Sequence, residues 1–570
     1  MTEEVDVVII GAGPVGLTIA NYLGCMGVSA VVLEQRDKLI DYPRGVGMDD
    51  ECLRSFQAIG LGEAVAQHTT PGQKMRFLTM TGKTFALIDP QTREFGWPRR
   101  NSFIQPMVDE ILYEGLQRFD CISTWFGTEL LSFEQTGDAV QLQVQQGDTR
   151  LSIRSRWLVG CDGGRSIVRK SLDIGFDGIT DSTRWVVIDI LDDPLGLPDS
   201  YLHCVPSRPY VSIALPHGMR RLEFMVFGDE TEEELCSPAG IQSLLKRALP
   251  FPERANVLRS RVYTHNARLA QHFRKGNALI AGDAAHLMPV WQGQGYNSGI
   301  RDATNLAWKL AMVIRGEASA DILESYESER REHAKAMIDL SVTAGRIFAP
   351  TNKFVAWLRD RIALALNAIP PVKRYFVQMR FKPMPRFTKG IVLTNASGQP
   401  EGRTTGRLFP QPMVIAQDGK SIRFDDVIGI RFAIVSWGTD PQLHLSEAGR
   451  DYWRTLGARF IAVVPETQLN NFRGTVQDGT IMIGDAQGVL HEWFAHQDAD
   501  GSIVVLRPDR VVAAIVQPQH LEAASGRLMS MIGDRTSQTQ CAPDGPKPTP
   551  AQRDKGERGA PMSVTFRERY

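Results

Sequence analysis

Three glycines and a carboxylate near the start of the chain form the clearest group of residues that could bind a cofactor. Gly11, Gly13 and Gly16 directly follow residues 5–10, an apolar, β-branched run that suits a strand buried on both faces. Such glycines allow a tight turn, a close approach of the backbone to a pyrophosphate, and close packing of the next helix. Glu34 ends the next predicted strand, 18 residues after Gly16. A carboxylate there accepts hydrogen bonds from ribose hydroxyls and repels a 2′-phosphate, so the pattern predicts FAD or NAD rather than NADP.

A second glycine-rich stretch, residues 276–316, could hold the far end of such a cofactor. A strand predicted over residues 278–281 ends in Gly282 and Asp283, at the sheet edge where ligands bind in open α/β folds. A helix begins shortly afterwards, and its free N–H groups carry about half a positive charge. This charge favours a negative group such as N1 of a reduced flavin. The loop that leads into the helix contains Pro289, Gly293, Gly295 and Asn297.

Three further polar residues lie at turns where a ligand could reach them. Asp162 begins an Asp-Gly turn after a strand predicted over residues 157–161, a common turn that gains value from its place in a dinucleotide-binding chain. Arg44 lies in a loop rich in glycine and proline, and is equally consistent with a ligand contact and with a solvated arginine. Gln105 begins a predicted helix and could point its amide at a ligand, although an isolated glutamine there is more often without a special role.

A β-rich stretch over residues 185–227 predicts an antiparallel sheet that could form one wall of a substrate pocket. Arg208 or Arg221 could bind a substrate carboxylate on that wall, although most arginines on sheets are solvated. His286 follows the Gly-Asp turn and is a further catalytic candidate, but hydrogen bonding within the loop suits it better. The sequence assigns no catalytic base.

Composition excludes several classes of function. The chain has 570 residues, of which 43% are apolar and 23% charged, with a net charge of −1. This balance gives no electrostatic case for binding nucleic acid or a membrane, and no apolar run approaches the roughly 20 residues that span a bilayer. The acidic start of the chain is unlike a signal peptide. Seven cysteines without a CxxC pair indicate free thiols in the cytoplasm, and no metal site is expected.

Three motifs stand in a fixed order along the chain: the glycine turn over residues 11–16, the Asp-Gly turn at 162–163 and the Gly-Asp turn at 282–283. Their order and spacing resemble those of the single-component flavin aromatic hydroxylases of the para-hydroxybenzoate hydroxylase fold. Longer stretches, among them DYPRGVGMDDECLR and MPVWQGQGYNSG, extend the resemblance to about residue 530. It implies bound FAD, with Glu34 on the adenosine ribose, Asp283 on the ribityl chain, and Gly295 with Asn297 beside the isoalloxazine ring. The other implied cofactor contacts are Gly11, Gly13, Gly16, Arg36, Arg44, Gln105, Asp162, Pro289 and Gly293.

The expected fold is α/β: a Rossmann-like parallel sheet with an inserted antiparallel substrate domain and a thioredoxin-like C-terminal domain. Since no cysteine lies between Cys236 and Cys541, that last domain has no dithiol chemistry, and its expected role is packing or dimer contacts. The predicted parts are residues 1–180 and 262–385 for the FAD-binding core, 181–261 for the insertion, 386–533 for the thioredoxin-like domain and 534–570 for a disordered tail.

The resemblance implies a monooxygenase that uses NADH and O₂ to hydroxylate a phenolic acid ortho to its hydroxyl group. NADH would visit only transiently, because the chain carries one complete dinucleotide fingerprint. The cofactor supplies the oxygen chemistry, at the flavin C4a atom, and the protein supplies orientation and a dry cavity. Three alternatives stay open: a hydroxylase of another phenolic or polyketide substrate, a flavin oxidase or dehydrogenase, and a flavin-binding sensor without enzymatic activity.

Overall fold

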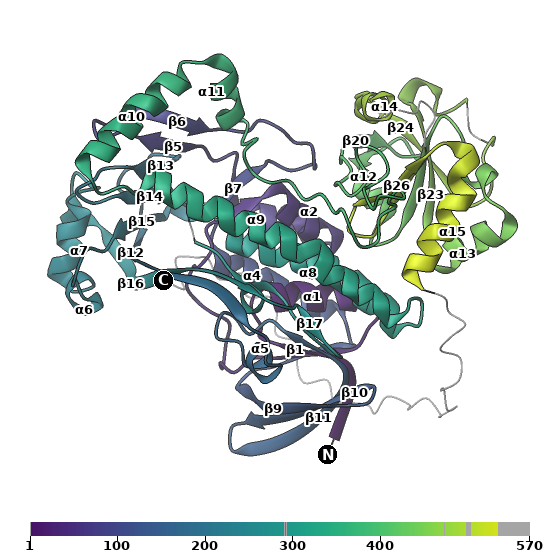
Figure 1. Cartoon of the computed structure of the whole chain (residues 1–570), viewed down its shortest axis with the longest axis horizontal. Helices are drawn as coiled ribbons and strands as arrows, with labels where there is room; N and C mark the ends of the chain where they lie inside the picture. The colour runs from purple at the N-terminus through teal and green to yellow at the C-terminus, as the bar shows by residue number, and fades with distance from the viewer. Residues whose placement is uncertain (1, 290, 292, 472–473, 497–502, 534–570) are drawn as a thin grey trace.

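The structure is a computed structural model that describes residues 2–533 except 290, 292, 472–473 and 497–502. The predicted tail, residues 534–570, lies outside the described residues. A parallel sheet with strand order β18-β11-β1-β2-β8 forms the base of the molecule (Figure 1). Its strands are β1 (Thr2–Ile10), β2 (Ala30–Leu33), β8 (Ile122–Trp125), β11 (Thr149–Gly160) and β18 (Ala278–Ile280). Antiparallel strands β9 (Thr128–Thr136), β10 (Ala139–Gln146) and β17 (Arg274–Lys275) extend it.

The first unit of the sheet follows the local sequence closely. Strand β1 consists largely of Val and Ile, and its side chains from Val7 to Ile9 are fully buried, as a strand covered on both faces requires. Helix α1 (Pro14–Cys25) begins at the glycine turn and ends before Gly27, whose φ of +70° stops the helix. The predicted strand, turn, helix and second strand are therefore confirmed.

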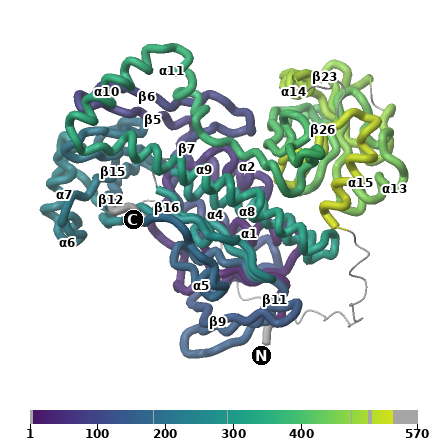
Figure 2. Tube along the Cα trace, in the orientation of Figure 1, coloured from purple at the N-terminus to yellow at the C-terminus, as the bar shows by residue number. Residues whose placement is uncertain are grey.

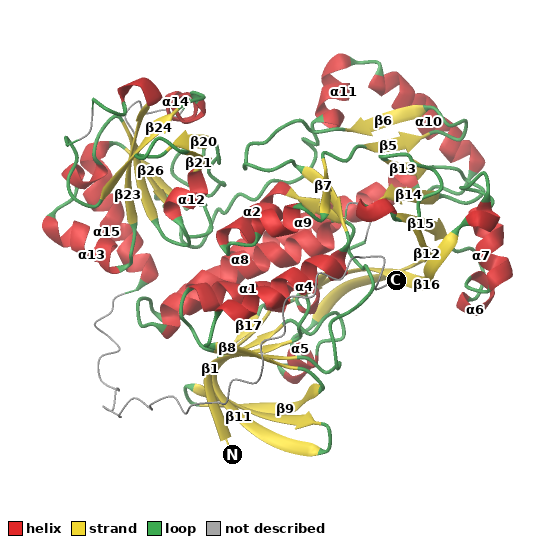
Figure 3. Cartoon of the chain, turned by 180° about the vertical axis from the view of Figure 1, so that it is seen from behind, coloured by secondary structure: helices red, strands yellow, loops and turns green. Residues whose placement is uncertain are grey.

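Long helices cover the parallel sheet (Figure 3). Helix α8 packs against α1, and a side chain at Gly299 would lie 2.6 Å from Val15, so a small residue is needed there. Helix α9 packs on α8, and η6 (Ala320–Leu323) joins the two. The covering helices are α2 (Asp50–Ala58), α4 (Gln105–Gly115), α8 (Gln294–Ile314) and α9 (Glu324–Phe348).

A second sheet, antiparallel apart from one strand pair, has the order β19-β16-β12-β15-β14-β13-β5-β6. Its core strands lie between β11 and β18 in the chain, as the predicted insertion requires. The sheet also recruits β5 and β6 from the first part of the chain, so it extends beyond the predicted residues 181–261. The strands are β5 (Met75–Leu78), β6 (Thr84–Ile88), β12 (Phe176–Leu191), β13 (Ser200–His203), β14 (Tyr210–Ala214), β15 (Arg220–Met225), β16 (Asn256–Ala270) and β19 (His286–Leu287).

Helices cover this second sheet from outside. One group consists of α6 (Glu232–Leu235) and α7 (Pro238–Leu245), and a second group, α10 (Lys353–Asn367) and α11 (Pro370–Val377), packs on β6. A small sheet of β3 (Gly47–Asp49), β7 (Arg100–Phe103) and β4 (Thr69–Pro71) supports the loop before α2. None of the helices in the described part of the chain is long and apolar enough to cross a membrane.

The C-terminal residues form a separate lobe, seen in yellow and green in Figure 2. Its sheet has the order β21-β20-β24-β23-β22-β25-β26, with β22, β23 and β24 parallel and the outer strands antiparallel. This mixed sheet with flanking helices is compatible with the thioredoxin-like prediction, which stays a prediction. Its strands are β20 (Met413–Ile415), β21 (Ser421–Arg423), β22 (Ala433–Trp437), β23 (Arg459–Pro465), β24 (Thr480–Asp485), β25 (Ile503–Leu506) and β26 (Val512–Val516), and its helices are α12 (Phe424–Ile428), α13 (Glu447–Thr455), α14 (Val489–Ala495) and α15 (Leu521–Ile532).

Candidate active site

The glycine turn between β1 and α1 has the close contacts that only glycine permits. Gly11 has a φ of +105°, and a Cβ there would lie 2.6 Å from the carbonyl oxygen of Cys161. A Cβ at Gly16 would lie 2.1 Å from the carbonyl oxygen of Gly11. A Cβ at Gly13, in contrast, would meet nothing within 4 Å, and no side chain caps the helix at this residue. The turn therefore presents free N–H groups to open space, which suits a pyrophosphate.

Glu34 is held at the end of β2 beside this turn. Its Oε2 accepts a hydrogen bond from the backbone N–H of Ala12 at 3.0 Å, and its Oε1 accepts one from the backbone N–H of Arg36 at 3.0 Å. The Arg36 side chain itself is exposed. Each carboxylate oxygen keeps a further lone pair, so the group is oriented and can still accept a hydrogen bond from a ribose hydroxyl.

The Gly-Asp turn lies directly against the start of α1. Gly282 has a φ of +63°, and a Cβ there would lie 2.8 Å from Val15. Asp283 follows in η4 (Gly282–Ala284), and its carboxylate lies 3.3 Å from the Arg44 guanidinium. Both side chains are partly exposed. This pair brings two predicted cofactor residues together, although they are far apart in the sequence.

Asn297 fastens the start of α8 to the loop before α2. Its Oδ1 accepts the backbone N–H of Asp49 at 3.0 Å, and its Nδ2 donates to the carbonyl oxygens of Gly47 at 3.0 Å and Gly293 at 2.9 Å. Gly293, with a φ of +61°, is the residue before the helix, and no side chain caps it. These hydrogen bonds tie the helix start to the loop before α2. Gly295 lies in its first turn, and Pro289 is buried in the loop before it.

Gln105 also positions a loop. Its Oε1 accepts the backbone N–H of Gly45 at 2.7 Å, and its Nε2 donates to Asp109 Oδ2 at 2.9 Å. Burial raises the pKa of Asp109 to about 7, more than the hydrogen bond from Gln105 lowers it. The Gln105 side chain is therefore engaged within the protein at both ends, and it shapes the loop that contains Arg44.

Asp162 fits the expected Asp-Gly motif and leaves one atom for a ligand. Its Oδ2 accepts the backbone N–H groups of Ile167 at 2.7 Å and Val168 at 3.1 Å, at the start of α5 (Ile167–Ser171). Its Oδ1 is buried and has no hydrogen-bond partner among the described residues. Burial raises the pKa of this carboxyl group. A donor from a bound molecule would satisfy Oδ1.

His286 belongs to a buried network beneath the Gly-Asp turn. Its Nε2 lies 2.6 Å from Asp302 Oδ2, and Asp302 also accepts the backbone N–H of Gly282 at 3.0 Å and Arg330 Nε at 2.8 Å. Burial raises the pKa of Asp302, but the charges of His286 and Arg330 outweigh burial and lower it to about 2. The network joins the turn to α8 and α9. This arrangement favours hydrogen bonding within the loop as the role of His286.

The two arginines considered for a substrate carboxylate already have carboxylate partners. Arg208 forms two hydrogen bonds with Glu230, at 2.5 and 3.1 Å. Arg221 is 3% exposed and forms a two-bond ion pair with Asp189, at 2.8 and 3.0 Å. Its Nη1 also donates to the backbone carbonyl of Arg44, and its Nη2 to that of Pro43. Both guanidiniums therefore already have a carboxylate partner within the protein, and a role in binding a substrate carboxylate stays a prediction.

A cofactor as long as FAD fits these elements. The Gly282–Asp283 turn joins the start of α1 to the start of α8, because Gly282 lies against Val15 of α1 and Gly299 of α8. The open space at Gly13 and the buried Oδ1 of Asp162 are the observations that carry this fit. The described residues contain no group of three or more side chains that could hold a metal ion.

Sequence reasoning missed four side chains near the far end of this site: Trp185, Glu223, Tyr263 and Trp291. Trp185 and Trp291 pack edge to face, with ring centroids 5.0 Å apart. Tyr263 donates a hydrogen bond to Glu223 at 3.0 Å. The alternation of residues in the predicted strands could have placed Glu223 on one face with Arg221, but the pairing with Tyr263 depends on strand register.

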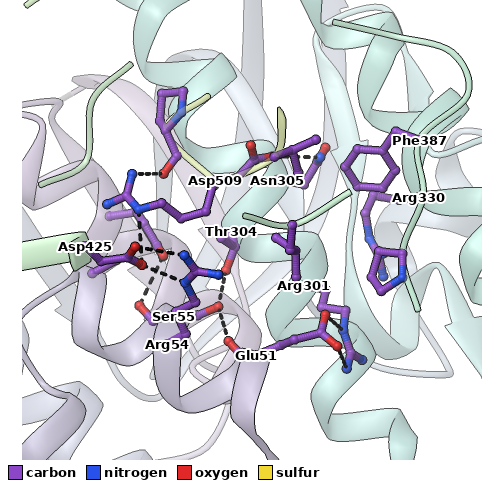
Figure 4. Close-up of a pocket in the computed structure, with 17 residues that line it drawn as sticks. Glu51, Arg54, Ser55, Arg301, Thr304, Asn305, Arg330, Phe387, Asp425 and Asp509 are labelled. Carbon is purple, nitrogen blue, oxygen red and sulfur yellow. Dashed lines mark hydrogen bonds and ion pairs between the residues drawn. The ribbon is translucent and has the colours of Figure 1, made fainter. Parts of the chain in front are cut away.

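A polar pocket lies elsewhere, between helices α2 and α8 and the C-terminal lobe (Figure 4). Arg54 donates to both oxygens of Asp425, at 2.7 and 2.8 Å, and Arg510 lies 3.1 Å from the same carboxylate. Each charged group that lines this pocket has an oppositely charged partner, either in the lining itself or directly behind it. The ion pairs of Asp425 join the lobe to the rest of the chain. The pocket is distinct from the cofactor site.

Comparison with known proteins shows the family of this chain. A family model described as FAD binding domain matches residues 4–341, and one described as HcaD C-terminal domain matches residues 406–531. The chain belongs to the FAD-binding family of the single-component FAD-dependent aromatic hydroxylases. The resemblance inferred from the sequence is thereby confirmed, as is the class of enzyme, a flavoprotein aromatic monooxygenase.

The relatives compared share the name 3-(3-hydroxy-phenyl)propionate/3-hydroxycinnamic acid hydroxylase. The chain is 52% identical over 535 residues to the protein of that name from Klebsiella pneumoniae subsp. pneumoniae, covering 94% of this chain and 96% of the relative. It is 51% identical over 533 residues to the one from Escherichia coli O139:H28, covering 93% and 95%. The similarity spans nearly the whole of both chains.

Solved structures share the fold. The flavin-dependent monooxygenase PieE, in complex with FAD and substrate, aligns with a TM-score of 0.77 at 21% identity, over 93% of this chain and 99% of that one. Aklavinone-11 hydroxylase, in a ternary complex with FAD and aklavinone, aligns with a TM-score of 0.73 at 22% identity, over 93% and 100%. At these identities the likeness concerns the fold alone.

Proposed function

We propose that this protein hydroxylates 3-(3-hydroxyphenyl)propionate, and also 3-hydroxycinnamate, ortho to the existing hydroxyl group, with NADH and O₂ as co-substrates in the breakdown of aromatic compounds. The observation that carries the proposal is identity of 52% that spans both the FAD-binding part and the C-terminal lobe. The site supports it, because the dinucleotide turn and the uncapped start of α8 offer two places where the ends of one elongated cofactor could bind.

Each candidate cofactor-binding residue then has a defined role. The free N–H groups at the start of α1 bind the pyrophosphate, and Glu34 binds the adenosine ribose. Asp283, oriented by Arg44, binds the ribityl chain. The start of α8, held by Asn297, favours negative charge on the flavin ring beside it. When bound, the flavin supplies the redox and oxygen-transfer chemistry.

One experiment tests the function directly. The FAD-loaded protein is mixed with NADH and a panel of meta-hydroxylated phenylpropanoic, cinnamic and benzoic acids, and both NADH consumption and products are measured. We expect the fastest coupled turnover with 3-(3-hydroxyphenyl)propionate and a catechol product. Hydrogen peroxide as the sole oxidised product would favour the flavin oxidase alternative. Bound FAD without NADH oxidation under any condition would favour a sensor. A colourless protein that takes up no FAD would exclude both flavin enzymes, the hydroxylase and the oxidase.

Two further proposals concern where the enzyme is located and whether it forms a dimer. We propose that it works in the cytoplasm, because the described cysteines are all free thiols, which suits a reducing compartment. We also propose that the C-terminal lobe contributes to a homodimer, and light scattering during size exclusion measures this: a mass near the monomer value of 63.4 kDa would contradict it.

A further inference from the structure

One face of the antiparallel sheet carries a row of polar side chains. In the register of β12, β15 and β16, Val187 lies opposite Glu223, Asp189 opposite Arg221, and Trp185 opposite Tyr263. Residues two apart on a strand, and residues paired across strands, point to the same face of a sheet. Asp189, Arg221, Glu223 and Tyr263 therefore share one face.

This face is turned toward the cofactor-binding part of the chain. The intervening residues, such as Val186 and Phe224, point to the other face and pack with Leu244 and Leu245 of α7. On the polar face, Trp185 and Tyr263 pack in one cluster with Trp291, which comes from the loop before α8. The row thus lies between the sheet and the proposed flavin site.

Contacts at one end of the row lead to the Arg44 loop. Arg221 donates to the carbonyl oxygens of Pro43 at 2.6 Å and Arg44 at 3.1 Å. The same guanidinium lies 4.0 Å from a carboxylate oxygen of Glu223. Arg221 therefore connects Glu223 to the loop that contains Arg44, the residue that pairs with Asp283.

Contacts at the other end lead to the loop before α8. The rings of Tyr263 and His265 have centroids 5.4 Å apart, and those of His265 and Trp291 are 5.6 Å apart. Trp291 also packs edge to face on Trp185. The Tyr263–Glu223 pair consequently lies between the two loops that border the expected isoalloxazine position, where an aromatic substrate must bind.

We propose that Tyr263 and Glu223 form the acid–base pair that binds the phenol hydroxyl group of the substrate and removes its proton. This assignment rests on the proposed function. The Tyr263 hydroxyl donates to Glu223 Oε2 at 3.0 Å, and its oxygen has lone pairs left to accept a proton from the substrate.

The proton transfer balances without any further reactant. The substrate O–H bond breaks as Tyr263 takes that proton, and Tyr263 passes its own proton to the Glu223 carboxylate. The substrate becomes a phenolate, Glu223 becomes a carboxylic acid, and Tyr263 stays neutral. The added electron density on the ring raises its nucleophilicity at the ortho carbon, where hydroxylation is proposed.

The surroundings of Glu223 suit a proton acceptor. Burial raises its pKa, against the lowering effects of Arg221 and the hydrogen bond from Tyr263, while Asp189 raises it further. A carboxylate with a raised pKa accepts a proton from a phenol more readily than an exposed one does. Burial also raises the pKa of Tyr263 well above its ordinary value, so the tyrosine itself does not ionise near neutral pH.

The decisive measurement is the ionisation of bound substrate, read from ultraviolet absorbance. The FAD-loaded protein without NADH is titrated with 3-(3-hydroxyphenyl)propionate at several pH values, and the phenolate difference spectrum gives the pKa of the bound phenol. We expect a bound pKa below that of the free phenol in the parent protein. In Tyr263→Phe and Glu223→Gln it should rise by at least about one unit, which corresponds to a tenfold smaller phenolate fraction.

Tyr210→Phe is the matched control. Tyr210 lies on the same sheet but on the other face, where it stacks on Phe224 with ring centroids 5.3 Å apart. Its substitution should leave the bound phenol pKa unchanged. With NADH present, Tyr263→Phe should also consume NADH while releasing more peroxide and less catechol than Tyr210→Phe.

Two failures can be told apart. If the parent protein yields a catechol but Tyr263→Phe and Glu223→Gln ionise the bound phenol as Tyr210→Phe does, the acid–base assignment is wrong and the proposed function stands. If the parent yields no catechol from any acid of the panel, the proposed function fails first. Tyr263→Phe preserves the ring and its packing, so it remains informative even if Glu223→Gln destabilises the fold.

Discussion

Glu34 is the residue whose carboxylate should contribute most to cofactor affinity at the adenosine end. Replacing it with alanine removes the acceptor for the ribose and also the acceptor for the backbone N–H of Ala12. The loss of a charged hydrogen-bond acceptor costs about 1.5–3 kcal/mol, so Glu34→Ala should weaken FAD binding about 10- to 150-fold. Quenching of flavin fluorescence during titration of the apoprotein measures this.

The exposed Asp37, three residues further on, provides the control. Asp37→Asn should change the affinity less than twofold, because no element of the site depends on this side chain. Equal FAD affinity in Glu34→Ala and the parent protein would remove Glu34 from the cofactor site.

At the level of single residues, the sequence did not predict the hydrogen-bond partners of the candidate site residues. Asn297 and Gln105 stay predicted cofactor contacts, and in the structure their amides bond to backbone groups of the loop around residues 45–49. Those partners are 60 to 250 positions away along the chain, and no local pattern encodes them. The same holds for Arg221, because its pairing with Asp189 follows from the register of two antiparallel strands.

Among the elements, the start of α8 depends most on one side chain. Asn297→Ala would leave the buried backbone N–H of Asp49 and the part-buried carbonyl oxygens of Gly47 and Gly293 without this partner. Unsatisfied buried groups are costly, so the free energy of unfolding should fall by about 2–4 kcal/mol, and the flavin content should fall with it. Urea unfolding and the flavin absorbance of the purified protein measure both effects.

Asn352→Ala is the comparison for this prediction. Asn352 caps α10 by accepting the N–H groups of Phe354 and Val355, but it is exposed, so water replaces the lost bonds and the cost should be about 1 kcal/mol. If the two substitutions cost the same and flavin content does not change, Asn297 does not organise the site.

Elements with a strong local pattern were predicted well, and those defined by distant pairing were not. The strand β1, the glycine turn and α1 follow from an apolar run, a fixed glycine spacing and a terminating Gly27. The antiparallel sheet was predicted only in part, because β5 joins it through a parallel pairing with β13. That pairing links residues 75–78 to residues 200–203, and neither segment's alternation specifies its partner.

For the whole molecule, the order of the parts was predictable but their contacts were not. The change in composition near residue 386 indicated a separate C-terminal domain. Its attachment uses Arg54 with Asp425, and Glu329 with Arg507, which are charged residues that sequence reasoning assigns to solvent. They are buried because each finds an opposite charge on the other part of the chain.

This attachment should be sensitive to acid. Glu329 on α9 is fully buried between Lys309, at 2.7 Å, and Arg507 of the C-terminal lobe, at 2.6 Å. Burial raises the pKa of Glu329, but the two cations outweigh burial and lower it from 4.5 to about 2. A group whose pKa is lower in the folded state stabilises that state above its unfolded pKa. This contribution, on the order of 3 kcal/mol, should be complete above about pH 4.5 and be lost as the pH falls toward 2.

Denaturation by urea between pH 7 and pH 3 tests this dependence. In the parent protein the urea midpoint should fall steeply below pH 4.5, whereas Glu329→Gln should start lower at pH 7, since it leaves Arg507 and Lys309 without their carboxylate, and then change less with pH. Asp339→Asn is the control, because Asp339 lies on the same helix in an exposed pair with Lys335 and should reproduce the parent curve. Parallel curves for the parent and Glu329→Gln would mean that acid acts elsewhere, and that Glu329 does not link protonation to the attachment of the C-terminal lobe.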